Sequence, residues 1–132
     1  MEFRYDEGHA EVLELDASPE RIAAMLGLLN DRDRTYCSLS VNDGWYIQCA
    51  GTAEAMIVEV REPHVSGFRH YAIGKPVQHE RKSGLFGLRK ETVREADETF
   101  DAEETAALFR SFEETRALPG GYVRRDMTGD FK

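Results

Sequence analysis

Cysteine and histidine are the residue types in this chain best suited to nucleophilic or metal chemistry. The chain has two cysteines, Cys37 and Cys49, and four histidines, none spaced to place two ligands on one face of a helix or strand. A Cys–His dyad requires neighbours that lower the thiol pKa, yet both cysteines have apolar neighbours. We therefore expect no metal site and no catalytic residue. Both cysteines are interpreted as reduced core residues, with a strained cross-strand disulfide as the alternative.

Carboxylates are plentiful, but their placement does not predict acid–base catalysis. Glycosidase chemistry needs two carboxyl groups at a defined separation in a cleft, whereas residues 95–104 gather acids at the start of a predicted helix, where they complement its dipole. The glycine-containing segments GTAEA and PGGY lack the spacing and the Lys-Ser/Thr pair of a phosphate-binding loop. We expect no cofactor, and we expect that the protein is not an enzyme.

The charge balance restricts the kinds of partner. The formal net charge of −8 argues against nucleic acid and anionic membranes and favours a basic protein partner, although an acidic surface also serves solubility alone. No apolar run approaches the roughly 20 residues of a membrane span. The N-terminal MEFRYDEGHAEV is acidic where a secretory signal would be basic and then apolar. We expect a cytoplasmic protein.

Any functional site must be positioned by the secondary structure, and its central part is residues 35–61. These residues predict three antiparallel strands. Apolar and polar residues alternate on either side of the Asn42–Gly44 loop, and a four-residue turn, residues 51–54, follows. The predicted pairs are Val41 with Trp45, Leu39 with Ile47 and Cys37 with Cys49, then Met56, Val58 and Val60 against Cys49, Ile47 and Trp45.

Two capped helices and further strands flank this meander. Residues 10–15 predict a strand, residues 68–73 a fourth strand of undecided facing, and residues 122–127 an edge strand. Ser18 as N-cap predicts a helix over residues 19–29, and a capping box at Asp101 predicts another over residues 102–117. Residues 77–98 are expected to form an exposed hairpin or mobile excursion, and residues 128–132 a frayed tail.

These elements predict one domain, residues 1–132, of the two-layer α+β class. We expect an antiparallel meander sheet of four to six strands with two helices packed on one face. The predicted core is Trp45, Ile47, Val58, Val60, Leu39, Leu26, Leu108, Phe109 and Phe112.

The polar face of the meander is the candidate recognition surface. Polar groups interleaved with tyrosines on a rigid sheet suit protein binding, where Tyr and Arg are enriched and rigidity lowers the entropy cost. An ordinary solvated face, or one covered by residues 77–98, is the alternative. The predicted partner-binding residues are Tyr36, Ser38, Tyr46, Gln48, Glu59, Arg61 and His70.

The order of features resembles a known group of proteins. A leading helix, then SLSVNDGWYIQCAG, MIVEV and RHYAIGK, then FDAEETAALFRSFEETRALPGGY is similar to the small immunity proteins of bacterial polymorphic toxin and contact-dependent inhibition systems, over about residues 18–127. The resemblance implies a non-enzymatic protein that neutralises one cognate toxin by occluding its active surface. From the net charge we expect the toxin to be basic, and we expect the protein to be a monomer or weak homodimer.

Two other hypotheses remain open. One is a small-ligand-binding or enzymatic α+β domain with a pocket lined by Tyr46, Glu59, Arg61 and His70. The other is a homo-oligomeric structural protein that uses an exposed sheet edge.

Overall fold

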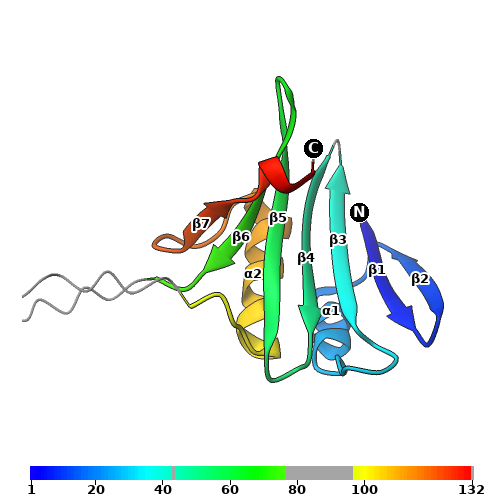
Figure 1. Ribbon diagram of the computed structural model, residues 1–132. Coiled ribbons are helices and arrows are strands. Elements are labelled where there is room, and N and C mark those ends of the chain that lie inside the picture. Colours follow the sequence, from blue (N-terminus) through cyan, green and yellow to red (C-terminus); the bar gives the residue numbers. More distant parts are fainter. Residues whose placement is uncertain (43, 77–96, 132) are drawn as a thin grey trace, which may run out of the picture.

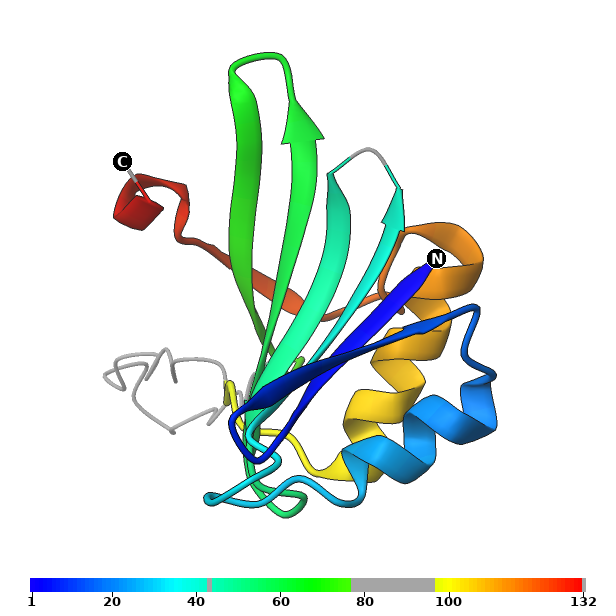
Figure 2. The same cartoon turned by 90° about the vertical axis from the view of Figure 1, so that its right-hand side faces the viewer.

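One antiparallel sheet with two helices on one of its faces makes up the fold (Figures 1 and 2). The computed structural model describes residues 1–42, 44–76 and 97–131. The α+β class and the two helices on one face are confirmed, but the prediction of four to six strands is wrong, because the sheet has seven, in the order β2-β1-β3-β4-β5-β6-β7. The strands are β1 Glu2–Glu7, β2 Ala10–Leu15, β3 Tyr36–Asn42, β4 Trp45–Gly51, β5 Met56–His64, β6 Gly67–Gly74 and β7 Val123–Asp126.

The strand that the sequence prediction missed is β1. It pairs with β2 on one side and with β3 on the other, and so joins the N-terminal hairpin to the meander. Phe3 and Tyr5 point into the core while Arg4 and Asp6 lie on the other face. This alternation was the available signal, but the acidic residues around it suggested only a polar terminus.

The predicted meander register is correct in part. Cys37 pairs with Cys49 and Leu39 with Ile47, but a bulge between Ser40 and Asn42 sets Asn42, not Val41, opposite Trp45. On the other side of β4, Ile47 faces Val60 and Cys49 faces Val58, which is two residues from the predicted register. The shift arises because β4 continues to Gly51, so that the turn is residues 52–55. A shift of two residues keeps every side chain on its predicted face.

Both helices begin where their caps predict and end earlier than expected. Helix α1, Pro19–Leu26, has the Ser18 Oγ accepting from Arg21 N at 3.1 Å, and it stops at Gly27. Helix α2, Ala102–Thr115, has the predicted capping box. It ends at Arg116, whose φ of 60° is left-handed and whose N–H bonds to the Phe112 carbonyl at 2.8 Å.

The core lies between the helices and the inner face of the sheet. Every predicted core residue is buried except Trp45, which is half-buried at the start of β4, with its ring 6.4 Å from that of Phe112. In β6, Tyr71 and Ile73 face the helices, so Phe68, His70 and Ala72 face the other way, which settles the facing of this strand.

Residues 128–131, which were expected to belong to a frayed tail, instead form a 3-10 helix. After β7, the predicted edge strand, a 3-10 helix η1, Thr128–Phe131, packs on β6. Met127 N donates to the His70 carbonyl at 2.7 Å, and His70 N donates to Thr128 Oγ1 at 3.0 Å. The excursion predicted for residues 77–98 falls almost wholly on 77–96, which lie outside the described residues. None of the described helices is long and apolar enough to cross a membrane.

Candidate partner-binding face

The sheet face away from the helices, here called the outer face, carries the predicted partner-binding residues. It faces the viewer in Figure 1, with both helices behind the sheet, and Figure 2 shows the two layers edge-on. The register brings all seven predicted residues together on this face. Its rows across β3, β4 and β5 are Tyr36–Ala50–Ile57, Ser38–Gln48–Glu59 and Ser40–Tyr46–Arg61, and the last row continues to His70 on β6.

A buried polar cluster lies at the β5–β6 side of this face. His70 is fully buried, and its Nδ1 accepts a hydrogen bond from Arg61 Nε at 3.1 Å. Its Nε2 is hydrogen-bonded to Glu59 Oε1, which also accepts from Gln48 Nε2 at 3.4 Å. A guanidinium only donates, so Nδ1 must be the acceptor and Nε2–H the donor to the carboxylate. The hydrogen bonds therefore assign the accepting role to Nδ1 and the donating role to Nε2.

Aromatic rings enclose the Arg61 guanidinium. Its central carbon lies 3.8 Å from the ring centroid of Phe68, 4.7 Å from that of Phe131 and 5.3 Å from that of Tyr46. These distances are within the range of cation–π attraction, and the enclosure holds the side chain in one conformation. Arg61 is thus a pre-ordered cation at the β5–β6 corner of the outer face.

The C-terminal helix η1 covers this corner of the face. The Phe131 ring lies 4.5 Å from the His70 imidazole and 6.0 Å from the Phe68 ring, while 47% of Phe131 remains exposed. In the pocket hypothesis, Tyr46, Glu59, Arg61 and His70 would line a ligand cavity. Phe131 occupies the space above His70, so no feature of this corner favours that hypothesis.

Hydrogen bonds also order the opposite end of the face, where β1, β2 and β3 meet. The Tyr36 hydroxyl donates to Glu11 Oε1 at 2.7 Å, and burial, followed by this hydrogen bond, raises the pKa of Tyr36 to about 12. Burial likewise raises the pKa of Tyr46. Both tyrosines are therefore neutral near pH 7, and the hydrogen bond to Glu11 also fixes the hydroxyl group of Tyr36.

Next to Tyr36, the Asp6 carboxylate fixes the entry into β3. Its Oδ1 accepts from Thr35 N at 2.6 Å and from Tyr36 N at 3.1 Å, and its Oδ2 accepts from Thr35 Oγ1 at 2.6 Å. Burial alone would raise the pKa of Asp6, but these hydrogen bonds outweigh it and lower the pKa below its ordinary value of 3.8.

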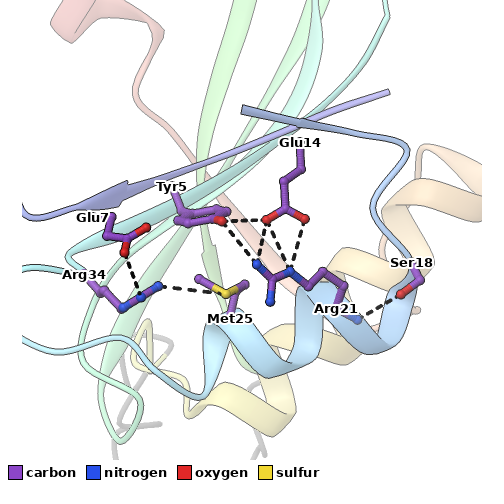
Figure 3. Close-up of polar contacts among 7 residues, drawn as sticks. All are labelled: Tyr5, Glu7, Glu14, Ser18, Arg21, Met25 and Arg34. Atoms are coloured by element: carbon purple, nitrogen blue, oxygen red, sulfur yellow. Dashed lines mark hydrogen bonds and ion pairs between the residues drawn. The ribbon is translucent and has the colours of Figure 1, made fainter. Parts of the chain in front are cut away.

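A polar cluster between β1, β2 and α1 holds the N-terminal hairpin against the helix layer (Figure 3). Tyr5 Oη donates to Glu14 Oε2 at 2.5 Å, and Arg21 Nη2 reaches the same oxygen at 2.9 Å. The hydrogen bond from Arg21 is the main reason that the pKa of Glu14 is lowered. The Arg34 guanidinium adds a longer ion pair to Glu7, at 3.7 Å. This cluster fixes the position of β2, which borders the outer face.

The two cysteines lie on the inner face, away from all of these groups. Cys37 and Cys49 are directly opposite each other in the β3–β4 pair, buried and not joined by a disulfide. Burial raises the pKa of the Cys49 thiol well above its ordinary value. Among the described residues, no group of three or more His, Cys, Asp or Glu side chains is placed to hold a metal ion.

Sequence reasoning missed some residues of the outer face. Phe68 belongs to the set in β6 whose facing was undecided, and the β5–β6 register places it opposite Pro63. Phe131 gave no signal, because nothing in a C-terminal TGDFK indicates which strand it will cover. Leu13 and Leu15 alternate with acids in AEVLEL, which was the available sign that they share the outer face.

Comparison of this chain with protein-family models, with curated proteins and with solved structures finds no match. The fold and the outer face together define an α+β domain with one open sheet face. This face is the candidate functional surface of the domain.

Proposed function

We propose that this protein is an immunity-type binding protein that neutralises a cognate bacterial toxin by occluding its active surface. The observation that carries the proposal is the outer face, where polar and aromatic side chains lie in register and neither α1 nor α2 covers them, although η1 overlies the corner at His70. The proposal includes a cytoplasmic location, a basic toxin as partner and action as a monomer or weak homodimer.

The order of the outer face favours binding. Hydrogen bonds hold Tyr36, Gln48 and Arg61 in defined conformations before any partner arrives, which reduces the entropy lost on association. Ile57, half exposed at 50%, adds apolar area beside Tyr36 and Ala50. An apolar centre with tyrosines and a surrounding rim of polar groups is the usual composition of a protein interface.

Net charge supports the choice of a basic partner. At −8, the chain produces a negative field that attracts a cationic surface and speeds its diffusional encounter. Nuclease toxins that bind polyanionic substrates have such surfaces, because they must attract phosphates. The association rate should therefore fall as ionic strength rises, whereas the dissociation rate should change less.

Co-expression tests this proposal. A toxin domain encoded next to this gene would be induced in a bacterial host with and without the protein, and a tagged copy would be used to capture that domain from the lysate. We expect restored growth and a stoichiometric complex, and no protection against an unrelated toxin domain used as control. Growth arrest that persists in the presence of well-folded protein, with no complex recovered, would contradict the proposal.

A further inference from the structure

The two borders of the sheet differ in how they are protected from pairing with another chain. Strand β7 has only four residues, and its Arg124 and Arg125 make ion pairs with Glu62 at 3.6 Å and with Glu98 at 2.9 Å. Strand β2 has six residues, AEVLEL, with no proline, lysine or arginine. Charged residues, proline and short length are the usual means by which edge strands avoid pairing. The β2 border has neither a proline nor a short length, and its only charges are the two glutamates Glu11 and Glu14. No described strand lies beyond it (Figure 1).

The backbone of β2 shows which residues present free hydrogen-bonding groups. Asp16 N donates to the Met1 carbonyl at 3.1 Å, and paired residues of an antiparallel ladder alternate between bonded and non-bonded pairs. Glu14, Val12 and Ala10 therefore bond to β1. Glu11, Leu13 and Leu15 instead direct their N–H and C=O groups away from the sheet.

The same alternate residues carry the exposed apolar side chains. Leu13 is 48% exposed and Leu15 is 69% exposed, both on the outer face at the border. Backbone groups with no partner among the described residues thus coincide with exposed leucines on one strand. We propose that β2 pairs with β2 of a second copy of this chain, antiparallel about a two-fold axis at Leu13.

A second copy of this chain is the expected partner for β2, because the sequence of β2 is complementary to itself when two copies pair antiparallel. With the axis at Leu13, this residue faces its own counterpart, Leu15 faces Glu11 of the second copy, and Val12 faces Glu14. No two glutamates are opposed in this register. Moving the axis to Val12 would place Leu13 against Glu11 and separate the leucines, so the Leu13 register is favoured.

The dimer joins two seven-stranded sheets into one and makes their outer faces continuous. Because each copy has a net charge of −8, the copies repel each other, and association should be weak at low ionic strength. Salt that screens this repulsion should therefore strengthen the dimer. The opposite salt response is expected for a basic partner, which separates this inference from the proposed function.

Sedimentation equilibrium of two variants tests the pairing of β2 strands. The variants are Leu13→Lys and a matched control, Leu28→Lys. Leu28 has a similar exposure of 51% but lies in the loop after α1, away from the β2 border. We expect the wild type and Leu28→Lys to associate reversibly as concentration approaches roughly 1 mM. Leu13→Lys should stay monomeric, because it sets two cations against each other. A wild type that remains monomeric throughout, or a Leu13→Lys variant that associates equally well, would overturn the proposal.

Disulfide trapping tests the register. Directly opposed residues that exchange hydrogen bonds have Cα atoms about 5.5 Å apart, within the roughly 4.4–6.8 Å that a disulfide spans. With diamide as oxidant, the thiols of two Leu13→Cys chains form one S–S bond and pass two electrons and two protons to the N=N bond. We expect Leu13→Cys to form covalent dimers at least tenfold faster than Leu28→Cys. Equal rates would refute a two-fold axis at Leu13.

Discussion

At the scale of single residues, the outer face depends on side chains that are fixed before a partner arrives. His70 is held in place between Arg61, which donates to its Nδ1, and Glu59, which is bonded to its Nε2. Phe131 closes the corner over the imidazole, so access to His70 depends on one aromatic ring.

Replacing Phe131 with alanine should therefore expose His70. Diethylpyrocarbonate, which modifies accessible imidazoles, should label His70 in the Phe131→Ala variant and not in the wild type, as read by mass spectrometry. Phe131 is about half exposed, so the change should lower the free energy of unfolding by only about 1 kcal/mol. Val65→Ala, at a fully exposed position, is the control. Equal labelling of His70 in both proteins would show that Phe131 does not cover it.

The cysteine thiols should be unreactive in the native state. Cys37 and Cys49 are buried, and burial raises the pKa of Cys49, which suppresses the reactive thiolate. Ellman's reagent should detect no thiol in the native protein and two per chain in denaturant. One or two thiols that react at once under native conditions would contradict the buried inner-face position. The absence of free thiols in denaturant would instead reveal a disulfide.

The Asp6 carboxylate should make the protein sensitive to acid. Its folded-state pKa is below the ordinary 3.8, so the ionised form stabilises the fold above that value, and the contribution is lost as the pH falls through the folded pKa. Asp6→Asn should therefore destabilise the protein at neutral pH and by progressively less below 3.8. Urea unfolding over this pH range measures the difference. A difference that stayed constant would argue against the hydrogen bonds to Thr35 and Tyr36.

At the scale of elements, α2 is the main cover of the inner face. Phe109 is 1% exposed and packs in the core between this helix and the sheet. Phe109→Ala should lower the free energy of unfolding by roughly 3–5 kcal/mol, since it removes a buried ring and leaves a cavity. Leu28→Ala, at a half-exposed site, should change it by well under 1 kcal/mol. Similar losses in both variants would contradict the assigned core.

The elements also show what sequence reasoning can and cannot determine here. Alternation and caps predicted the faces of β3 to β5 and the starts of both helices, because these depend on neighbouring residues. They did not determine where β4 turns, since a shift of two residues preserves every face. The position of η1 could not be predicted from the sequence either, because the hydrogen bond between Thr128 and His70 joins residues 58 positions apart in the chain. The residues of the outer face were therefore predictable, but the packing of η1 over one corner of it was not.

At the scale of the whole molecule, the helix layer and the sheet have different roles. Helices α1 and α2 and the inner face supply the core, which leaves the outer face free of these two helices. Strands β2 and β7 are its borders, and η1 overlies the corner at His70 (Figure 2). The proposed toxin interface and the proposed β2 pairing use different parts of this surface, one its centre and one its border. A dimer through β2 would place two such interfaces side by side.

The most direct test is the affinity of the cognate toxin domain for two matched variants, measured by calorimetry. Ala50 is exposed on the outer face beside Tyr36, and Ala24 is exposed on α1. An arginine at the outer-face position adds bulk and positive charge where a basic partner should dock. We predict that Ala50→Arg weakens binding at least 100-fold, which corresponds to about 2.7 kcal/mol, while Ala24→Arg leaves it within threefold of the wild type. Equal affinities, or a loss confined to Ala24→Arg, would contradict binding through the outer face.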